Sequence, residues 1–187
     1  MILIEDNLPS FDIAEIGVWK GGTFQHLVRF AEFMGVHAHA FDSFEGMAEP
    51  TEGDKDKDGC VGYPKGKLNV GGKEAFMRSM EVFGIDSSRY KIHAGFVPDC
   101  FESAGKLQRF SLVRIDLDHY EPTVIAAEWA WERLVPDGVL LFHDYFPEKN
   151  ALASKAIKEF IVKHQKEIPN SALCVNGIEL TIKKEKS

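Results

Sequence analysis

Apolar and polar positions along this chain follow two periods, one typical of strands and one typical of helices. Short apolar runs, which predict buried strands, are separated by stretches in which apolar residues recur every three or four positions, as on one helix face. The runs predict strands at residues 11–17, 36–41, 90–93, 111–116 and 139–142. The helical spacing predicts helices at residues 23–34, 74–83, 122–134 and 151–166. This alternation predicts an α/β fold, with a doubly wound, mostly parallel sheet and helices on both faces.

The boundaries of several elements are also marked by residue type. Thr23 is a plausible N-cap, and Pro122 suits the first position of its helix. Residues 172–182 form two apolar runs around Asn176-Gly177, a pair that predicts an antiparallel hairpin with a type I′ turn. The chain shows no linker, so we expect one domain over residues 1–187. Residues 46–72 lack apolar periodicity, and a loop of this length inside a domain is typically a lid or a binding segment.

Composition and charge exclude several classes of protein. The chain has 187 residues, of which 44% are hydrophobic, and its net charge is −7 with no cluster of basic residues. We therefore expect no nucleic-acid or anionic-membrane partner. No apolar run approaches the roughly 20 residues of a membrane span, and the first apolar run reaches Glu5 too early for a signal peptide. Three widely spaced cysteines, Cys60, Cys100 and Cys174, indicate free thiols and a cytoplasmic location. The aromatic-rich helices allow a homodimer.

A glycine-rich turn, residues 15–23, joins the first predicted strand to the first predicted helix. Ligands of open α/β sheets bind beyond the carboxyl ends of the strands, where Gly17 permits a sharp turn and Gly21 and Gly22 permit close approach of backbone. The GxxxGG spacing differs from GxGxxG, which disfavours a pyrophosphate ligand. Glu15 suits a cationic or hydroxylated ligand instead, although a tight turn without a ligand is the simpler alternative.

Asp42 ends the second predicted strand, next to the first strand in a doubly wound sheet. A carboxylate at that place can accept hydrogen bonds from both ribose hydroxyls of a nucleoside. The alternative is a solvated aspartate that caps the turn at Asp42-Ser43.

Acidic residues and histidines follow two further strands. Asp116, Asp118 and His119 come after the fourth predicted strand, and His143 and Asp144 come after the fifth. Because adjacent parallel strands lie about 4.8 Å apart, these groups reach the same edge of the sheet. A divalent cation would offset their mutual repulsion, and helix-capping aspartates are the alternative.

The run Asp54–Gly59 resembles the start of a calcium loop. The twelfth position of such a loop carries a bidentate glutamate, whereas this chain has Lys65 there, so a solvated lid is favoured.

Four segments together resemble the macrocin O-methyltransferase family, whose members are class I S-adenosylmethionine-dependent enzymes that methylate hydroxyls of antibiotic sugars and related molecules. The segments are AEIGVWKGG at residues 14–22, FDSFEG at 41–46, RIDLDHYE at 114–121 and HDY at 143–145. They occur in the order found in the family, and the similarity covers roughly residues 11–146. The resemblance implies S-adenosyl-L-methionine as cofactor, a divalent cation (Mg or Mn), and a small-molecule hydroxylated acceptor.

The resemblance also implies roles for individual residues. By this resemblance the glycine-rich turn contacts the methionine part and the ribose of the donor. The residues of the turn in question are Glu15, Gly17, Gly21, Gly22 and Thr23. Asp42 and Ser43 would contact the ribose and the adenine edge, with Gly95 and Phe96 near the adenine. Asp116 would border the donor and bind the metal, and Asp118, or alternatively His119, would take the proton of the acceptor.

The chain departs from the family pattern at one metal ligand. The paired aspartates of the family fall on His143 and Asp144, so an imidazole replaces one carboxylate. Imidazole favours manganese, iron or zinc over magnesium, and we expect a retained site with weaker magnesium affinity. The resemblance also implies a helical segment before the first strand, and we expect this chain to lack it. Two alternatives stay open, a non-catalytic nucleoside-binding or assembly protein and an NAD-dependent oxidoreductase, with a metal-dependent hydrolase as a weaker third.

Overall fold

The computed structural model describes residues 11–55, 59, 63–146 and 152–185. The expectations for Cys60 and for the middle of the run Asp54–Gly59 lie outside the described residues.

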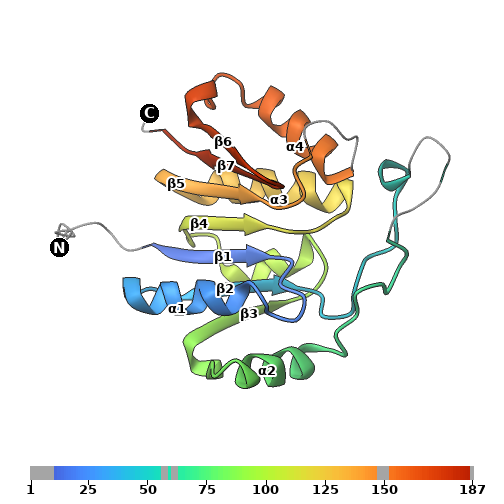
Figure 1. Ribbon diagram of the computed structural model, residues 1–187, viewed down its shortest axis with the longest axis vertical. Coiled ribbons are helices and arrows are strands. Elements are labelled where there is room, and N and C mark those ends of the chain that lie inside the picture. The colour runs from blue at the N-terminus through green and yellow to red at the C-terminus, as the bar shows by residue number, and fades with distance from the viewer. Residues whose placement is uncertain (1–10, 56–58, 60–62, 147–151, 186–187) are drawn as a thin grey trace.

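Within the described residues, seven strands form one sheet in the order β3-β2-β1-β4-β5-β7-β6 (Figure 1). Neighbouring strands are parallel from β3 to β5, and β7 pairs antiparallel with both β5 and β6. The expected fold class, a mostly parallel sheet with a C-terminal antiparallel hairpin, is confirmed. The strands are β1 (Asp12–Ile16), β2 (Ala38–Asp42), β3 (Tyr90–Ala94), β4 (Phe110–Ile115), β5 (Leu134–Phe142), β6 (Leu173–Asn176) and β7 (Glu179–Lys183).

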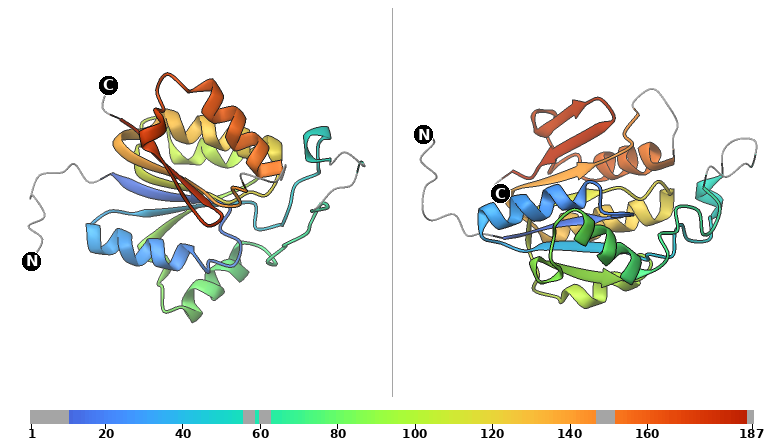
Figure 2. Two further views of the ribbon diagram at one scale, coloured as in Figure 1. Left: turned by 45° about the horizontal axis from the view of Figure 1, so that its top comes forward. Right: turned by 60° about the horizontal axis from the view of Figure 1, so that its bottom comes forward.

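Helices cover both faces of the sheet (Figure 2). On one face α1 (Phe24–Met34) and α2 (Lys73–Val82) bury a core that contains Phe24, Phe76 and Met80. On the other face α3 (Tyr120–Arg133) and α4 (Leu152–Lys163) bury a core that contains Trp131 and Phe160. Short 3-10 helices complete the structure at η1 (Glu52–Asp54), η2 (Ser87–Arg89), η3 (Asp99–Ala104) and η4 (Asn170–Ala172). No helix among the described residues has the length and apolar character that crossing a membrane requires.

Two predicted helix starts differ in detail from the structure. Thr23 stands at the N-cap of α1, but its backbone is helical and its side chain makes no capping hydrogen bond. Helix α3 begins at Tyr120, so Pro122 is the third helical residue rather than the first. Proline is tolerated there because the first N–H groups of a helix have no partner inside it.

Two strand predictions are also corrected. Strand β5 begins at Leu134 instead of 139, because Leu134 pairs with Phe110 before the chain bulges and Val139 resumes the ladder. In the hairpin Asn176 pairs with Glu179, so the turn residues are Gly177 and Ile178. Of these two only Gly177 has a positive φ, at 63°, whereas a type I′ turn needs positive φ at both positions.

Candidate functional site

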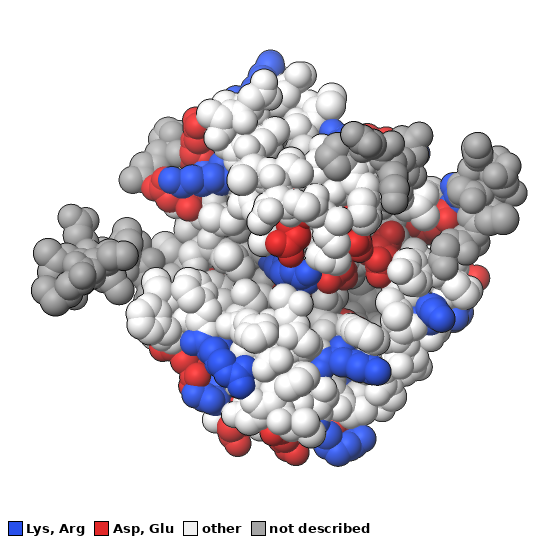
Figure 3. Space-filling view, viewed as in Figure 1, with Lys and Arg blue, Asp and Glu red and all other residues white. Residues whose placement is uncertain are grey.

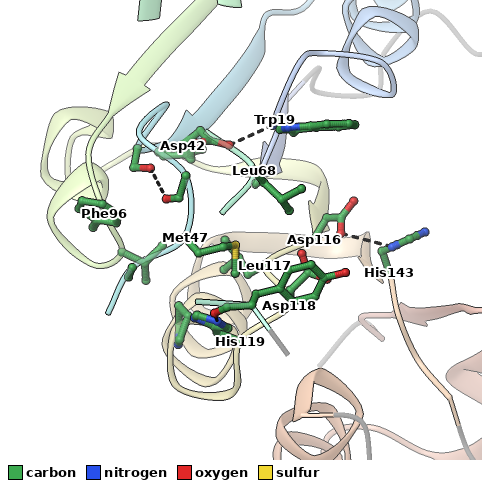
Figure 4. Close-up of a pocket in the computed structure, with 18 of the residues that line it drawn as sticks. Trp19, Asp42, Met47, Leu68, Phe96, Asp116, Leu117, Asp118, His119 and His143 are labelled. Carbon is green, nitrogen blue, oxygen red and sulfur yellow. Dashed lines mark hydrogen bonds and ion pairs between the residues drawn. The ribbon is translucent and has the colours of Figure 1, made fainter. Parts of the chain in front are cut away.

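A cavity of about 340 Å³ lies at the carboxyl ends of the five parallel strands (Figure 4). Figure 3 shows acidic side chains gathered to the right of centre, on the side where the strands of Figure 1 end. The predicted site residues that line this cavity are Gly17, Asp42, Ser43, Gly95, Phe96, Asp116, Asp118, His119, His143 and Asp144. The predicted site residues that are absent from its lining are Glu15, Gly21, Gly22 and Thr23. All assigned roles stay predictions, but the structure brings most of these residues to one place.

The glycine turn after β1 lies directly against the end of β4. Gly17 has a φ of +87°, and a Cβ at this position would be 1.9 Å from the carbonyl oxygen of Asp116. A side chain is therefore excluded by both conformation and space. Gly21 serves packing instead, since a Cβ there would be 2.5 Å from Sδ of Met80 in α2. A Cβ at Gly22 would meet no atom within 4 Å.

Asp42 holds the glycine turn in place from the end of β2. Its Oδ2 accepts hydrogen bonds from the backbone N–H groups of Val18 at 2.9 Å and Trp19 at 3.0 Å. Its Oδ1 accepts one from Phe44 N–H at 2.7 Å. Burial raises the pKa of Asp42, and these backbone N–H groups oppose the rise. Asp42 thus orders the cavity wall, and because its Oδ2 already accepts two bonds, Oδ1 is the oxygen with a lone pair available to a hydroxyl.

Three side chains after β4 and β5 could together hold a metal ion. Ligand atoms of Asp116, His143 and Asp144 all lie within 4.8 Å of one another. His143 Nδ1 is 3.3 Å from Asp116 Oδ1 and 3.1 Å from Asp144 Oδ1. That nitrogen is buried, and no hydrogen-bond geometry is satisfied with either carboxylate. Two carboxylate oxygens around an unpaired imidazole nitrogen fit a divalent cation, and the imidazole favours manganese, iron or zinc over magnesium.

Asp118 lies beside this cluster. Burial raises its pKa well above the ordinary value, and a hydrogen bond to Asp144 and repulsion from the carboxylates of Asp144 and Asp116 raise it further. Its backbone has a φ of 59°, in the left-handed region. A carboxyl group whose pKa is shifted toward neutrality suits proton transfer near neutral pH.

A buried cation supports the cluster from within the sheet. Arg114 Nη1 donates hydrogen bonds to Glu15 Oε1 and, at 2.8 Å, to Asp116 Oδ2. The Glu15 side chain is 1% exposed, and burial raises its pKa to about 7 even though Arg114 acts in the opposite direction. The second oxygen of Glu15, Oε2, is buried without a hydrogen-bond partner. Glu15 therefore does not line the cavity, and Arg114 connects it to Asp116, which does.

Sequence reasoning missed three contributors to the site. Arg114 interrupts an apolar strand, which is a signal that a buried partner exists. Tyr63 lines the cavity, and Asp54 is fully buried against the start of α3, but both lie in the aperiodic residues 46–72, which carry no local signal of their position. Cys100 is a buried free thiol, and burial raises its pKa to about 12.

The sheet order, the terminal hairpin and the position of the cavity define a class I methyltransferase fold. The solved structure of the O-methyltransferase NovP superposes with a TM-score of 0.72 at 17% identity, covering 95% of this chain and 73% of that one. The family model for macrocin O-methyltransferases matches residues 2–178. The chain therefore belongs to the macrocin O-methyltransferase family, as the sequence motifs suggested.

Two curated relatives are O-methyltransferases by name. The 8-demethyl-8-(2,3-dimethoxy-alpha-L-rhamnosyl)-tetracenomycin-C 4'-O-methyltransferase of Streptomyces olivaceus is 29% identical over 148 residues, which are 76% of this chain and 56% of that protein. The mycinamicin III 3''-O-methyltransferase of Micromonospora griseorubida is 24% identical over 154 residues, 76% of this chain and 58% of that protein. The chain thus spans a little over half the length of these relatives.

Proposed function

We propose that this chain transfers a methyl group from S-adenosyl-L-methionine to a hydroxyl of a glycosylated small molecule, at a site assisted by a divalent cation. The observation that carries the proposal is the cavity itself. One side is formed by the glycine turn and Asp42, and the other by the acidic cluster of Asp116, Asp118 and Asp144. Membership in the macrocin O-methyltransferase family supports the same chemistry.

The residues of the two sides have different tasks in this proposal. Gly17, Asp42 and Phe96 bind the donor, with Oδ1 of Asp42 accepting a hydrogen bond from a ribose hydroxyl. Asp116, His143 and Asp144 hold the cation, which when bound lowers the pKa of a hydroxyl and orients it. Asp118 accepts the proton of the acceptor hydroxyl. Residues 46–72 act as a lid that excludes water from the acceptor.

Methyl transfer from radiolabelled donor tests the proposal directly. The acceptors are mycinamicin III and 8-demethyl-8-(2,3-dimethoxy-α-L-rhamnosyl)-tetracenomycin C, each assayed after chelation with Mg²⁺ or Mn²⁺ added back. We expect methylation of a sugar hydroxyl, with Mn²⁺ more effective than Mg²⁺. His143→Ala should reduce the Mn²⁺ preference, and an unchanged preference would show that His143 is no ligand.

Binding of S-adenosylhomocysteine, measured by calorimetry, separates the donor side from the metal side. Asp116→Ala should abolish turnover and leave this binding largely intact, whereas equal loss of both contradicts the metal assignment. Donor binding without methylation of either acceptor would favour a non-catalytic nucleoside-binding protein. Stabilisation by NAD instead of S-adenosylhomocysteine would favour an oxidoreductase.

A further inference from the structure

Both ring nitrogens of His119 face residues of the 46–72 segment. Nε2–H donates a hydrogen bond to the backbone carbonyl of Tyr63 at 2.9 Å. Nδ1 lies 4.0 Å from Oδ2 of Asp54, and the His119 side chain is 2% exposed. A general base must come within about 2.6–3.2 Å of the proton that it removes. With Nε2 committed to Tyr63 and Nδ1 beside Asp54, His119 is badly placed to serve an acceptor, although it borders the cavity.

Asp54 provides a second attachment of the same segment to the same helix end. Its Oδ1 accepts a hydrogen bond from Tyr120 N–H at 2.6 Å, which satisfies a donor at the start of α3 that no helical carbonyl can reach. Its Oδ2 accepts a hydrogen bond from Thr51 N–H at 2.8 Å. The backbone of Gly53 packs so closely that a Cβ there would be 2.6 Å from the Tyr120 ring. Asp54, which is fully buried, therefore joins η1 to α3.

Tyr63 is the residue that this attachment places at the acidic cluster. It lines the cavity and is 37% exposed, although it belongs to neither core. The nearby carboxylates of Asp118, Asp144 and Asp116 raise the pKa of its hydroxyl, with Asp118 contributing most. Tyr63 and these three aspartates line the same cavity, where the proposed reaction removes a proton.

From these contacts we propose that His119 is a positioning residue, which holds Tyr63 through its carbonyl so that the tyrosine side chain forms the wall facing the sugar of the acceptor. The ring offers an apolar surface to the C–H face of a sugar, and the hydroxyl offers a hydrogen bond to a neighbouring sugar hydroxyl. Tyr63 is then a specificity-determining residue for the methylated position. This inference rests on the proposed function for the identity of the acceptor, but the positioning itself does not.

Hydrogen exchange of the full chain, saturated with S-adenosylhomocysteine, tests the positioning without any acceptor. His119→Leu keeps a similar volume but removes the donor, whereas His119→Gln keeps an N–H that can reach the carbonyl. The readout is the amides of Gly66 and Lys67, which donate to the carbonyls of Met47 and Pro64. We expect exchange about tenfold faster in His119→Leu and near wild type in His119→Gln, because loss of the anchor makes local opening easier. His26→Leu, at an exposed histidine of α1, is the matched control.

Unchanged exchange in His119→Leu overturns the inference, as does His119→Gln behaving like His119→Leu. Because His119 is buried, a loss of folding in His119→Leu is a separate risk. Tyr63→Ala and Tyr63→Phe, at a partly exposed position, provide the second test. On the acceptor that the methylation assay identifies, Tyr63→Ala should raise the acceptor KM about tenfold with a smaller change in kcat, as expected for lost substrate binding. Its affinity for S-adenosylhomocysteine should stay unchanged.

An unchanged acceptor KM in Tyr63→Ala refutes the role of Tyr63. Methylation of neither acceptor by the wild-type chain contradicts the proposed function, and the acceptor role of Tyr63 falls with it. The exchange experiment still decides whether His119 positions the segment, so the two failures are distinguishable.

Discussion

Replacing Arg114 with methionine should destabilise the protein by an amount that grows with pH. Arg114 is the cation that faces the buried carboxylate of Glu15, whose pKa burial raises to about 7. In the wild type this carboxyl binds a proton below pH 7 when folded, but only below its ordinary value of 4.5 when unfolded. A raised pKa of this kind favours the folded state at low pH, and the advantage is lost as pH rises to 7. Well above pH 7 the titration of Glu15 should no longer change the wild-type free energy of unfolding with pH.

Without Arg114 the folded carboxyl of Glu15 should remain protonated well above pH 7. The folded state then loses about 1.4 kcal/mol relative to the unfolded state for each further pH unit. Between pH 7 and pH 9 the difference between wild type and Arg114→Met should grow by about 2.3 kcal/mol, since the mutant loses about 2.7 kcal/mol and the wild type, half ionised at pH 7, loses about 0.4 kcal/mol. The lost hydrogen bond to Asp116 adds a constant of about 1–3 kcal/mol, as for a bond to a charged group.

Urea unfolding of both proteins at pH 7, 8 and 9 measures this difference. Arg78→Met, at an exposed arginine of α2, is the control for loss of a positive charge. In a Glu15→Gln background the same Arg114→Met substitution should give a cost independent of pH. A difference between wild type and Arg114→Met that stays constant from pH 7 to 9 would refute the reasoning, since Glu15 would then not be the titrating partner.

Three further predictions follow from single contacts. Burial lowers the pKa of His93 to about 4, so the unfolded state binds a proton first as pH falls below 6.5. Between pH 7 and 4 the wild type should therefore lose about 3 kcal/mol of unfolding free energy relative to His93→Phe. Urea titration of both proteins measures this difference. Gly17→Ala places a Cβ 1.9 Å from the Asp116 carbonyl and should weaken S-adenosylhomocysteine binding at least about tenfold by calorimetry; unchanged affinity would show that the turn adapts. Asp54→Ala leaves Tyr120 N–H unpaired and should lower the free energy of unfolding by about 2–4 kcal/mol, measured by thermal unfolding, with a smaller loss for Asp54→Asn. Equal losses would mean that the side-chain acceptor is unimportant.

The elements that sequence periodicity predicted well are those whose pattern is local. Each of the five parallel strands is an apolar run, and β2 pairs with β1 and β5 with β4 as expected. Asp116 and His143 therefore reach the same edge, as their positions after β4 and β5 implied. The errors arose where a contact outside the segment decides the structure. The start of β5 at Leu134 depends on pairing with Phe110 across the sheet. The hairpin turn falls one residue later than expected because cross-strand register, not the Asn-Gly pair, fixes it.

The buried ion pair that supports the acidic cluster could be predicted from the sequence, whereas the contribution of residues 46–72 could not. Glu15 and Arg114 are charged residues inside apolar strands, and the register of β1 on β4 places them directly opposite each other. Two such interruptions on neighbouring strands need each other, because a buried charge without a partner is too costly. No comparable rule leads to Tyr63 or Asp54, whose positions follow from hydrogen bonds made by single atoms of an aperiodic segment. The sequence can therefore reveal the charges that support the cluster, whereas the wall that faces the acceptor has to be seen in the folded chain.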